Sequence, residues 1–374
     1  IVTGTNGKTT TSRMIEQSWI ESGISYFANK TGANLLSGVT AEFAVHSSLS
    51  GKCRYTHALI EADEAAFKAI GKFVDPKAIV VTNVFRDQLD RYGEVTHTLE
   101  NIRIGIENSP HAKLALNADD SLCTSLAGAV PNPVLFYGVN TPIYTSRVEE
   151  LSDAPYCIRC KHAYVYDYVT YGHLGKYRCP ACGYSRPEPE IAVSEVAVTD
   201  AEHSEVVFDD GKKRIPATIC LPGGYNIYNA CAAMAAGKLL GLKEETVAAS
   251  RASFSCGFGR MEKFGNVRMI LVKNPAGLTQ TCNYISQFKG DKTVIFCLND
   301  NAADGRDISW IWDADIQADG KIYAAGKRSG DMALRLKYSG MDAEITDDVL
   351  QTVLRCKGDV FVVPHLYGND GHAA

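Results

Sequence analysis

The sequence lacks long hydrophobic runs, and it also lacks an excess of basic residues. No apolar run approaches the ~18 consecutive residues that a membrane-spanning helix needs, so we expect no transmembrane segment. Lys and Arg number 38 against 43 Asp and Glu, and the net charge of −5 argues against nucleic acid as the main partner. Internal repeats and low-complexity tracts are missing too. The chain has no initiator methionine, so we expect residues before Ile1 and conclude nothing from the missing targeting segment.

What is present fits a globular enzyme of more than one domain. Hydrophobic residues make up 45% of the chain, and 374 residues are too many for one core. Short apolar segments that end in a polar residue alternate with helix-compatible segments. This alternation is typical of an α/β fold with a parallel sheet, in which ligands gather at the carboxyl ends of the strands. The predicted strands are 56–61, 78–83, 113–117, 191–198 and 206–208, and then, in a second α/β pattern, 269–272, 293–298, 321–324 and 360–363.

A glycine-rich turn near the amino terminus separates a β-branched segment from a helix-compatible one. Backbone N–H groups in such a turn, together with the helix N-terminus, bind polyphosphate. Lys8 is placed to reach the outer phosphates, and Thr9 to bind Mg²⁺ through its hydroxyl. The match is partial, because the strict pattern has Gly where Val2 stands, and a turn without a ligand is the alternative. We predict ATP binding by Gly4, Thr5, Asn6, Gly7, Lys8, Thr9 and Thr10.

Four cysteines form two closely spaced pairs. Cys157 and Cys160 make the first pair, and Cys179 and Cys182 make the second, with a strand-like segment between them. Two such pairs close a tetrahedral Zn²⁺ site, and four thiolates leave no open position on the metal. We therefore predict a structural zinc ribbon inserted at about 152–189. Seven of the other cysteines, which stand singly, are interpreted as buried thiols rather than disulfides: Cys53, Cys123, Cys220, Cys231, Cys282, Cys297 and Cys356.

Further polar residues follow the predicted strands. Glu61 ends one of them, where a carboxylate can complete the Mg²⁺ shell opposite Thr9; capping of the next helix is the alternative. Asn226 and Asn229 precede the predicted helix 230–240, where their amides can meet an adenine edge or cap the helix. Arg260 stands at the predicted domain junction and is placed to clamp phosphates. A last polar cluster has two alternative roles, binding of a second cation or capping of a helix. Its members are Asn83, Asp87 and Asp90.

These motifs together resemble those of the Mur ligase superfamily. The resemblance rests on Gly4–Thr9, Glu61, Thr82–Asn83, Asn117–Asp120, Tyr225–Ala230 and Gly259–Glu262, which occur in the order of that superfamily. The four-cysteine insertion and the segment Leu298–Asp313 are similar to those of one family within it, the MurT-type subunits of lipid II isoglutaminyl synthase. The resemblance implies an α/β fold with a Mur-ligase-type P-loop central domain, 1–259, carrying the inserted four-cysteine zinc ribbon. A Rossmann-like α/β C-terminal domain would follow at 260–374.

The resemblance also implies an activity. ATP would phosphorylate the α-carboxylate of D-Glu in the lipid II stem peptide, and ammonia would displace phosphate to give D-isoglutamine. Lys8 and Glu61 would serve this step, with ATP, Mg²⁺ and structural Zn²⁺ as cofactors. Ammonia would come from a class I-like glutaminase subunit in a heterodimer. The chain would act in the cytoplasm, at the inner face of the membrane, without spanning it and without nucleic acid.

The chain does not carry a glutaminase site of that class itself. Such a site needs a nucleophilic Cys on a Gly-x-Cys-x-Gly elbow, and the nearest candidate has Phe254 in place of the first Gly. The resemblance gives Asp307 a catalytic role instead: its carboxylate would orient the catalytic His of the partner. The alternatives are pairing with Arg306 or capping of a helix that starts at Ile308. Gln88 stands where related ligases often have a metal-binding His, which puts a second Mg²⁺ in doubt.

Two other functions remain open from sequence. One is a stand-alone Mur-type or folylpolyglutamate-type ligase that joins an amino acid to a carboxylate. The segment Lys273–Gly277 lacks the Asp and His that amino-acid-adding ligases tend to have there, which favours ammonia as the nucleophile. The other is an ATPase that binds nucleic acid through the ribbon, and the overall acidity counts against it.

Overall fold

The structure is a computed structural model that describes residues 1–29, 32–86, 95–143, 153–199, 202–252, 260–301 and 307–365. It divides into two compact units: among the described residues, unit 2 comprises Arg86 and the residues from 260 onward, and unit 1 comprises the rest. The predicted boundary between 259 and 260 adjoins the segment 253–259, which lies outside the described residues. No helix among the described residues combines the length and the apolar character that crossing a membrane requires.

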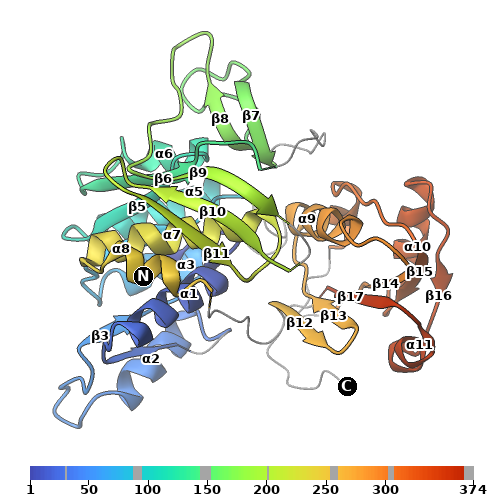
Figure 1. Ribbon diagram of the computed structural model, residues 1–374. Helices are drawn as coiled ribbons and strands as arrows, with labels where there is room; N and C mark the ends of the chain where they lie inside the picture. The colour runs from blue at the N-terminus through green and yellow to red at the C-terminus, as the bar shows by residue number, and fades with distance from the viewer. Residues whose placement is uncertain are drawn as a thin grey trace. The chain divides into compact units, whose positions relative to one another are not determined.

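Unit 1 is built on a seven-stranded sheet of order β1-β4-β5-β6-β9-β10-β11. Figure 1 labels β5, β6, β9, β10 and β11 of this sheet. Neighbouring strands from β1 to β9 pair in parallel, and the pairs β9–β10 and β10–β11 are antiparallel. The parallel pairing predicted for the strands at 78–83 and 113–117 is therefore confirmed, whereas the predicted strand 56–61 lies in a separate two-stranded sheet. A tight turn at Asp210–Lys213 joins β10 to β11, and a connection this short permits only antiparallel pairing. The strands are β1 Val2–Thr3, β4 Ala78–Val81, β5 Lys113–Asn117, β6 Val134–Val139, β9 Ile191–Thr199, β10 Ser204–Asp209 and β11 Arg214–Ile219.

Helices pack on this sheet through small buried residues. Helix α7 (Gly224–Leu240) crosses β4, β5, β6 and β9 and also contacts α1 (Lys8–Glu21). Its alanine-rich sequence is almost entirely buried, which lets the helix approach the sheet closely. Helices α3 (Glu64–Ile70) and α5 (Val95–Glu107) pack against each other where a Cβ on Gly105 would lie 2.4 Å from the Phe67 ring. The remaining helices of this sheet are α6 Ser121–Leu126 and α8 Glu244–Ala249.

Two smaller β elements complete unit 1. Strands β2 (Tyr26–Ala28) and β3 (His57–Leu59) form a parallel pair, and α2 (Leu36–Val45) lies between them in the sequence. Strands β7 (Val165–Tyr171) and β8 (Leu174–Arg178) form the antiparallel hairpin of the cysteine insertion. The strand expected around Tyr164–Tyr171 is thus present as β7.

Unit 2 contains a six-stranded sheet of order β12-β13-β17-β14-β15-β16. Every pair in it is parallel except β12–β13, so the second α/β pattern expected from sequence is confirmed. The strands are β12 Arg260–Phe264, β13 Val267–Ile270, β14 Lys292–Cys297, β15 Lys321–Ala325, β16 Glu344–Ile345 and β17 Asp359–Pro364. The helices are α9 Pro275–Ser286, the 3-10 helix η1 Ser309–Trp312, α10 Ser329–Tyr338 and α11 Val349–Arg355.

The single cysteines are only partly as expected. All cysteines among the described residues are free thiols, in line with the prediction of no disulfides. Cys123, Cys231, Cys282 and Cys297 are buried, as predicted. The prediction of burial is wrong for Cys53 and Cys220, which are exposed, and Cys356 is intermediate. Cys53 and Cys220 lie in connections outside the main sheets, where little surrounds a side chain.

Candidate functional site

The glycine-rich turn connects β1 to α1, as the sequence predicts. Gly7 caps α1 with φ 82°, a left-handed conformation that favours glycine. A Cβ at this position would also lie 2.1 Å from Oδ1 of Asn229. At Gly4, where φ is 118°, a Cβ would lie 2.4 Å from Oγ1 of Thr82. Both glycines are therefore required by the close approach of neighbouring elements.

The rest of the turn is fixed by reciprocal hydrogen bonds to the segment after β4. The Asn6 N–H donates to Oδ1 of Asn83 at 2.9 Å, and Nδ2 of Asn83 donates to the Asn6 carbonyl at 3.1 Å. Thr5 Oγ1 donates to the Phe85 carbonyl and accepts from the Phe85 N–H, at 3.1 and 3.0 Å. Asn83, for which the sequence left a cation or a cap open, holds the loop here. Its two predicted companions, Asp87 and Asp90, lie outside the described residues.

Lys8 is paired with an acidic residue that the sequence pattern does not single out. Its Nζ lies 2.8 Å from Oε1 of Glu64 and donates to the carbonyls of Gly4 and Thr5 at 2.6 and 3.2 Å. Burial lowers the pKa of Lys8, but the charge and the hydrogen bond of Glu64 outweigh burial and raise it above its usual value. The loop therefore holds a fully charged ammonium group next to the turn.

Thr9 and Glu61, the two predicted Mg²⁺ ligands, are in direct contact. Thr9 Oγ1 donates to Oε1 of Glu61 at 2.9 Å, and both residues are buried. Asn29 fixes the backbone of Glu61, because its Oδ1 accepts from the Glu61 N–H at 2.8 Å and its Nδ2 donates to the Glu61 carbonyl at 2.9 Å. The capping role that was the alternative for Glu61 belongs to Asp63, which accepts from Ala65 N at 3.1 Å.

A small cavity adjoins this pair. Ser12 contributes a buried hydroxyl that has no hydrogen-bond partner in the structure, and Glu16 contributes a carboxylate whose Oε2 lies 2.8 Å from Nη1 of Arg13. Burial raises the pKa of Glu16, and Arg13 opposes this effect. The cavity is lined by Thr9, Ser12, Arg13, Glu16, Ala28, Asn29, Leu59 and Glu61. A hard oxygen-liganded cation suits the Thr9–Glu61 end of this cavity.

Asn226 and Asn229 lie elsewhere in their helix than predicted. The sequence placed them before a helix at 230–240, but α7 begins at Gly224 and contains both. Nδ2 of Asn226 donates to the Pro222 carbonyl at 2.7 Å, and Nδ2 of Asn229 donates to Oδ1 of Asn226 at 3.0 Å. Asn229 also accepts from Thr11 Oγ1 at 3.4 Å, which links α7 to the phosphate loop helix.

The two site residues predicted in unit 2 are placed only in part. Arg260 begins β12 and pairs with Ile270, and its side chain lies outside what the structure describes. Asp307 precedes η1, and its Oδ1 accepts from the Ser309 N–H at 2.8 Å. This bond corresponds to the capping alternative for Asp307, although the helix starts at Ser309 with Ile308 as its N-cap residue and not at Ile308. Arg306 lies outside the described residues. Thr10, the last predicted nucleotide-binding residue, is buried in the first turn of α1.

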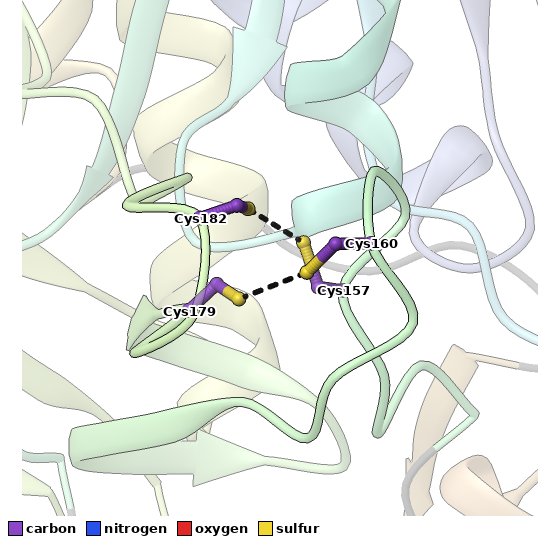
Figure 2. Close-up of side chains that lie close together, drawn as sticks. All are labelled: Cys157, Cys160, Cys179 and Cys182. Carbon is purple, nitrogen blue, oxygen red and sulfur yellow. Dashed lines mark hydrogen bonds between the residues drawn. The ribbon is translucent and has the colours of Figure 1, made fainter.

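The four predicted zinc ligands come together (Figure 2). All four sulfurs lie within 4.8 Å of one another, with Cys157 and Cys182 at 3.6 Å and Cys160 and Cys179 at 3.4 Å. A tetrahedral site with Zn–S bonds of ~2.3 Å separates its sulfurs by ~3.8 Å, so these residues fit Zn²⁺. Burial acts to raise the pKa of Cys157, but N–H groups of Cys160 and Arg159 lower it to about 6, which favours a thiolate.

Buried polar contacts connect the cysteine hairpin to the sheet, and no local sequence pattern points to them. Nε2 of His173, at the hairpin tip, lies 3.2 Å from Oδ1 of Asp120, and both side chains are fully buried. Nε of Arg186 lies 2.6 Å from Oδ1 of Asp119. Phe85 stacks on Tyr171 with ring centroids 5.6 Å apart. Since Phe85 also holds Thr5, the hairpin tip contacts the residue that fixes the phosphate loop.

The fold and the phosphate loop define this protein as a ligase of the Mur class, and sequence comparison agrees. Residues 2–237 match the Mur ligase middle domain, and residues 271–360 match the MurT ligase C-terminal domain. The subunit MurT of lipid II isoglutaminyl synthase (glutamine-hydrolysing) from Staphylococcus aureus is 35% identical over 92% of this chain and 78% of its own length. The MurT subunit from Streptococcus pneumoniae is 33% identical over 92% of this chain and 77% of its own length. The chain belongs to the Mur ligase family and, within it, to the MurT subunits.

Solved structures share the fold at low sequence identity. A pseudomurein peptide ligase type C from Methanothermus fervidus superimposes with a TM-score of 0.72 at 20% identity, covering 97% of this chain and 75% of that one. MurF from Acinetobacter baumannii gives a TM-score of 0.70 at 14% identity, covering 98% of this chain and 72% of that one. These structures confirm the predicted fold, and the sequence comparisons confirm the family predicted from the motifs.

Proposed function

We propose that this chain is the ATP-dependent subunit of a lipid II isoglutaminyl synthase, which amidates the α-carboxylate of D-Glu in the lipid II stem peptide. The identity of 35% over 92% of the chain to a MurT subunit carries the proposal. The phosphate loop with the adjoining Thr9–Glu61 pair supports it, because carboxylate amidation needs an activating phosphoryl group. The relatives are subunits of a glutamine-hydrolysing synthase, which supports a separate glutaminase partner.

The reaction has two balanced steps. A carboxylate oxygen attacks the γ-phosphorus of ATP, ADP leaves, and an acyl phosphate forms. Ammonia then attacks the acyl carbon and loses a proton, and phosphate leaves as the amide forms. Activation is necessary because the unmodified carboxylate would have to expel oxide. Since this substrate carries its lipid in a bilayer, the chain works next to the cytoplasmic membrane surface.

The residues contribute to these steps according to their chemistry. The ammonium of Lys8, held charged by Glu64, binds the transferring phosphoryl oxygens, and the N–H groups of the Gly4–Thr10 segment bind the others. Thr9 and Glu61 would hold Mg²⁺, which supplies charge neutralisation on the phosphates. The four-cysteine cluster would hold Zn²⁺ in a purely structural role. Asn226, Asn229 and Arg260 remain proposed nucleotide contacts.

Asp307 is the residue that links this subunit to glutamine hydrolysis in the proposal. Its carboxylate would orient the catalytic His of the glutaminase partner, in addition to capping η1. The test is a reconstituted complex with lipid II, ATP and either glutamine or an ammonium salt. Asp307→Asn is expected to abolish glutamine-dependent amidation and to leave ammonium-dependent amidation intact. Asp315→Asn, a nearby carboxylate that contacts Gln317, is the matched control.

Each outcome of this test has a defined meaning. Equal loss of both activities in Asp307→Asn would assign Asp307 to the fold or to the ATP chemistry. Amino-acid-dependent ADP formation without any amidation by ammonia would favour the stand-alone ligase. Isoglutamine formation without ADP would remove the proposal altogether.

A further inference from the structure

The α2 segment of unit 1 presents a surface without charge. Between Leu35 and Gly51 the only acidic or basic residue other than His46 is Glu42, which is largely buried and lies 3.3 Å from the His46 ring. Helices that face water usually carry charged side chains on that face. The exposed residues of this segment, which we call the α2 face, are Leu35, Leu36, Ser37, Thr40, Ala41, Ala44, Val45, Ser48, Leu49, Ser50 and Gly51.

A short hairpin ends the α2 face and projects an aliphatic side chain. Ser47 pairs with Cys53 in an antiparallel bridge, and the Ser48 N–H donates to the Lys52 carbonyl at 2.9 Å. This pairing puts Leu49 near the tip, where it is completely exposed, while Val45 before the hairpin is 66% exposed. Figure 1 shows α2 at the outer edge of unit 1, beside β3. An aliphatic tip in this position gains nothing from the protein's own core.

Basic and aromatic residues follow the tip. Lys52 and Arg54 are exposed on the returning arm of the hairpin. Tyr55 is 37% exposed, and its ring packs on His46 with centroids 5.1 Å apart. Apolar side chains flanked by Lys and Arg are typical of surfaces that bind anionic lipid, and Tyr is enriched at the level of the headgroups. The charge of this hairpin is opposite to the net charge of the chain.

The same segment leads back to the candidate magnesium site. The loop before α2 contains Asn29, which fixes the backbone of Glu61, and Asn34, whose carbonyl accepts from the Asp63 N–H at 3.0 Å. Helix α2 has 10 residues and so spans ~15 Å. The hairpin and the Thr9–Glu61 pair therefore lie toward opposite ends of one short segment.

We propose that the α2 face and its hairpin bind the surface of an anionic lipid bilayer. Bound there, the enzyme holds the segment that fixes Glu61 next to the bilayer in which the substrate is anchored. Leu49 and Val45 enter the headgroup region, and Lys52 and Arg54 contact lipid phosphates. The purpose of this contact rests on the proposed function, whereas bilayer binding is measurable without it.

The test measures binding of the purified complex to vesicles of phosphatidylglycerol and phosphatidylcholine, with phosphatidylcholine vesicles alone for comparison. Lys52→Gln with Arg54→Gln is expected to lower partitioning into the anionic vesicles about thirtyfold, at roughly a fivefold loss for each charge. Leu49→Asp is expected to lower it about tenfold or more. Phe73→Asp is the matched control, because Phe73 is 80% exposed next to Lys72 but lies outside the α2 face.

Amidation kinetics then connect binding to catalysis. The α2-face variants are expected to raise KM for lipid II in vesicles, with no comparable rise for a lipid-free peptide substrate. Vesicle binding by both variants at the level of Phe73→Asp would overturn the inference. Loss of the glutaminase partner from Leu49→Asp, with vesicle binding retained, would also overturn it by assigning the surface to that partner. Absence of amidation from the unmodified complex would instead reject the proposed function, while the vesicle result would stand.

Discussion

The phosphate loop and the cysteine hairpin lie in the same unit and satisfy their polar groups in different ways. In the loop, Lys8 pairs with Glu64, and Asn6 exchanges two hydrogen bonds with Asn83. In the hairpin, the four thiols have one another as nearest partners. Protein groups thus hold the loop in place, whereas four converging thiols suit a structural metal that would hold them together. The phosphate loop is therefore held by contacts within the protein, whereas the four-cysteine cluster would contribute to folding through a bound metal.

Replacing the loop lysine should give the largest loss of activity and so tests the first half of the comparison. Lys8→Met is expected to lower ATP-dependent amidation about a thousandfold, because the cation that meets the phosphoryl oxygens is gone. It should also destabilise the protein by about 3 kcal/mol, because Glu64 is left buried without its partner. ADP formation and thermal unfolding measure the two effects.

A second variant separates these two effects. Adding Glu64→Gln to Lys8→Met should restore part of the stability and none of the activity. Near-normal turnover in either variant would show that the loop does not act through this ammonium group.

Breaking the cysteine cluster tests the second half of the comparison. Cys157→Ser, or removal of the metal by a chelator, is expected to abolish zinc binding and to lower the melting temperature, since a structural metal contributes directly to folding. Nucleotide affinity should fall by only a few-fold, because the loop keeps its own partners. Elemental analysis, thermal unfolding and ATP titration measure the three quantities.

The control for this prediction is Cys220→Ser, which changes an exposed thiol outside the cluster. It should leave the zinc content and the melting temperature unchanged. A Cys157→Ser protein that keeps one zinc per chain would contradict the assigned ligand set.

Substitution at the tip of the cysteine hairpin tests whether this hairpin and the phosphate loop are connected, which sharpens the comparison between them. His173→Phe removes one partner of Asp120 and is expected to cost about 2 kcal/mol, because the buried carboxylate loses this hydrogen bond and keeps those from the N–H groups of Val84 and Leu122. Through Phe85, which contacts both the tip and Thr5, KM for ATP should rise a few-fold with little change in kcat. His162→Phe, at an exposed position of the ribbon, is the control. An unchanged KM would mean that the hairpin only stabilises the unit.

The smallest predicted effect is a pH dependence. Burial acts to raise the pKa of Asp120, but the charge and hydrogen bond of His173 and the N–H groups of Val84 and Leu122 lower it below its usual value of 3.8. A folded-state pKa that is depressed gives stability that is present above the unfolded pKa and is lost as pH falls through the folded pKa. The stability difference between the native protein and Asp120→Asn should therefore shrink as the pH falls below 3.8. Denaturant unfolding over this range measures it, and a constant difference down to about pH 2 would contradict it.

The features that depend on residues close together in the sequence could be predicted. The phosphate loop follows from adjacent residues, and the zinc ligands follow from the spacing of Cys157, Cys160, Cys179 and Cys182. Glu64 was not selected as the partner of Lys8 because 56 positions separate the two residues, and only the fold brings them together. The same holds for His173 and Asp120, at a separation of 53.

Errors in the predicted elements have physical causes. Asn226 and Asn229 were placed before a helix because Gly223–Gly224 is typical of a turn, yet burial of α7 overrides this local preference. Strand β11 was missed because Pro216 interrupts its pattern. A proline is tolerated there because β11 is the edge strand of the sheet.

The pairing of β6 with β9 gives the ribbon an architectural role. The two strands are parallel neighbours, with Val139 opposite Val193, and the ribbon lies between them in the chain. Parallel neighbours cannot be joined by a tight turn and normally need a crossover helix. Here the segment that bears the cysteines is that crossover. It therefore cannot be deleted without breaking the connection between β6 and β9. An engineer who wished to shorten this protein would have to replace it with another bridging element.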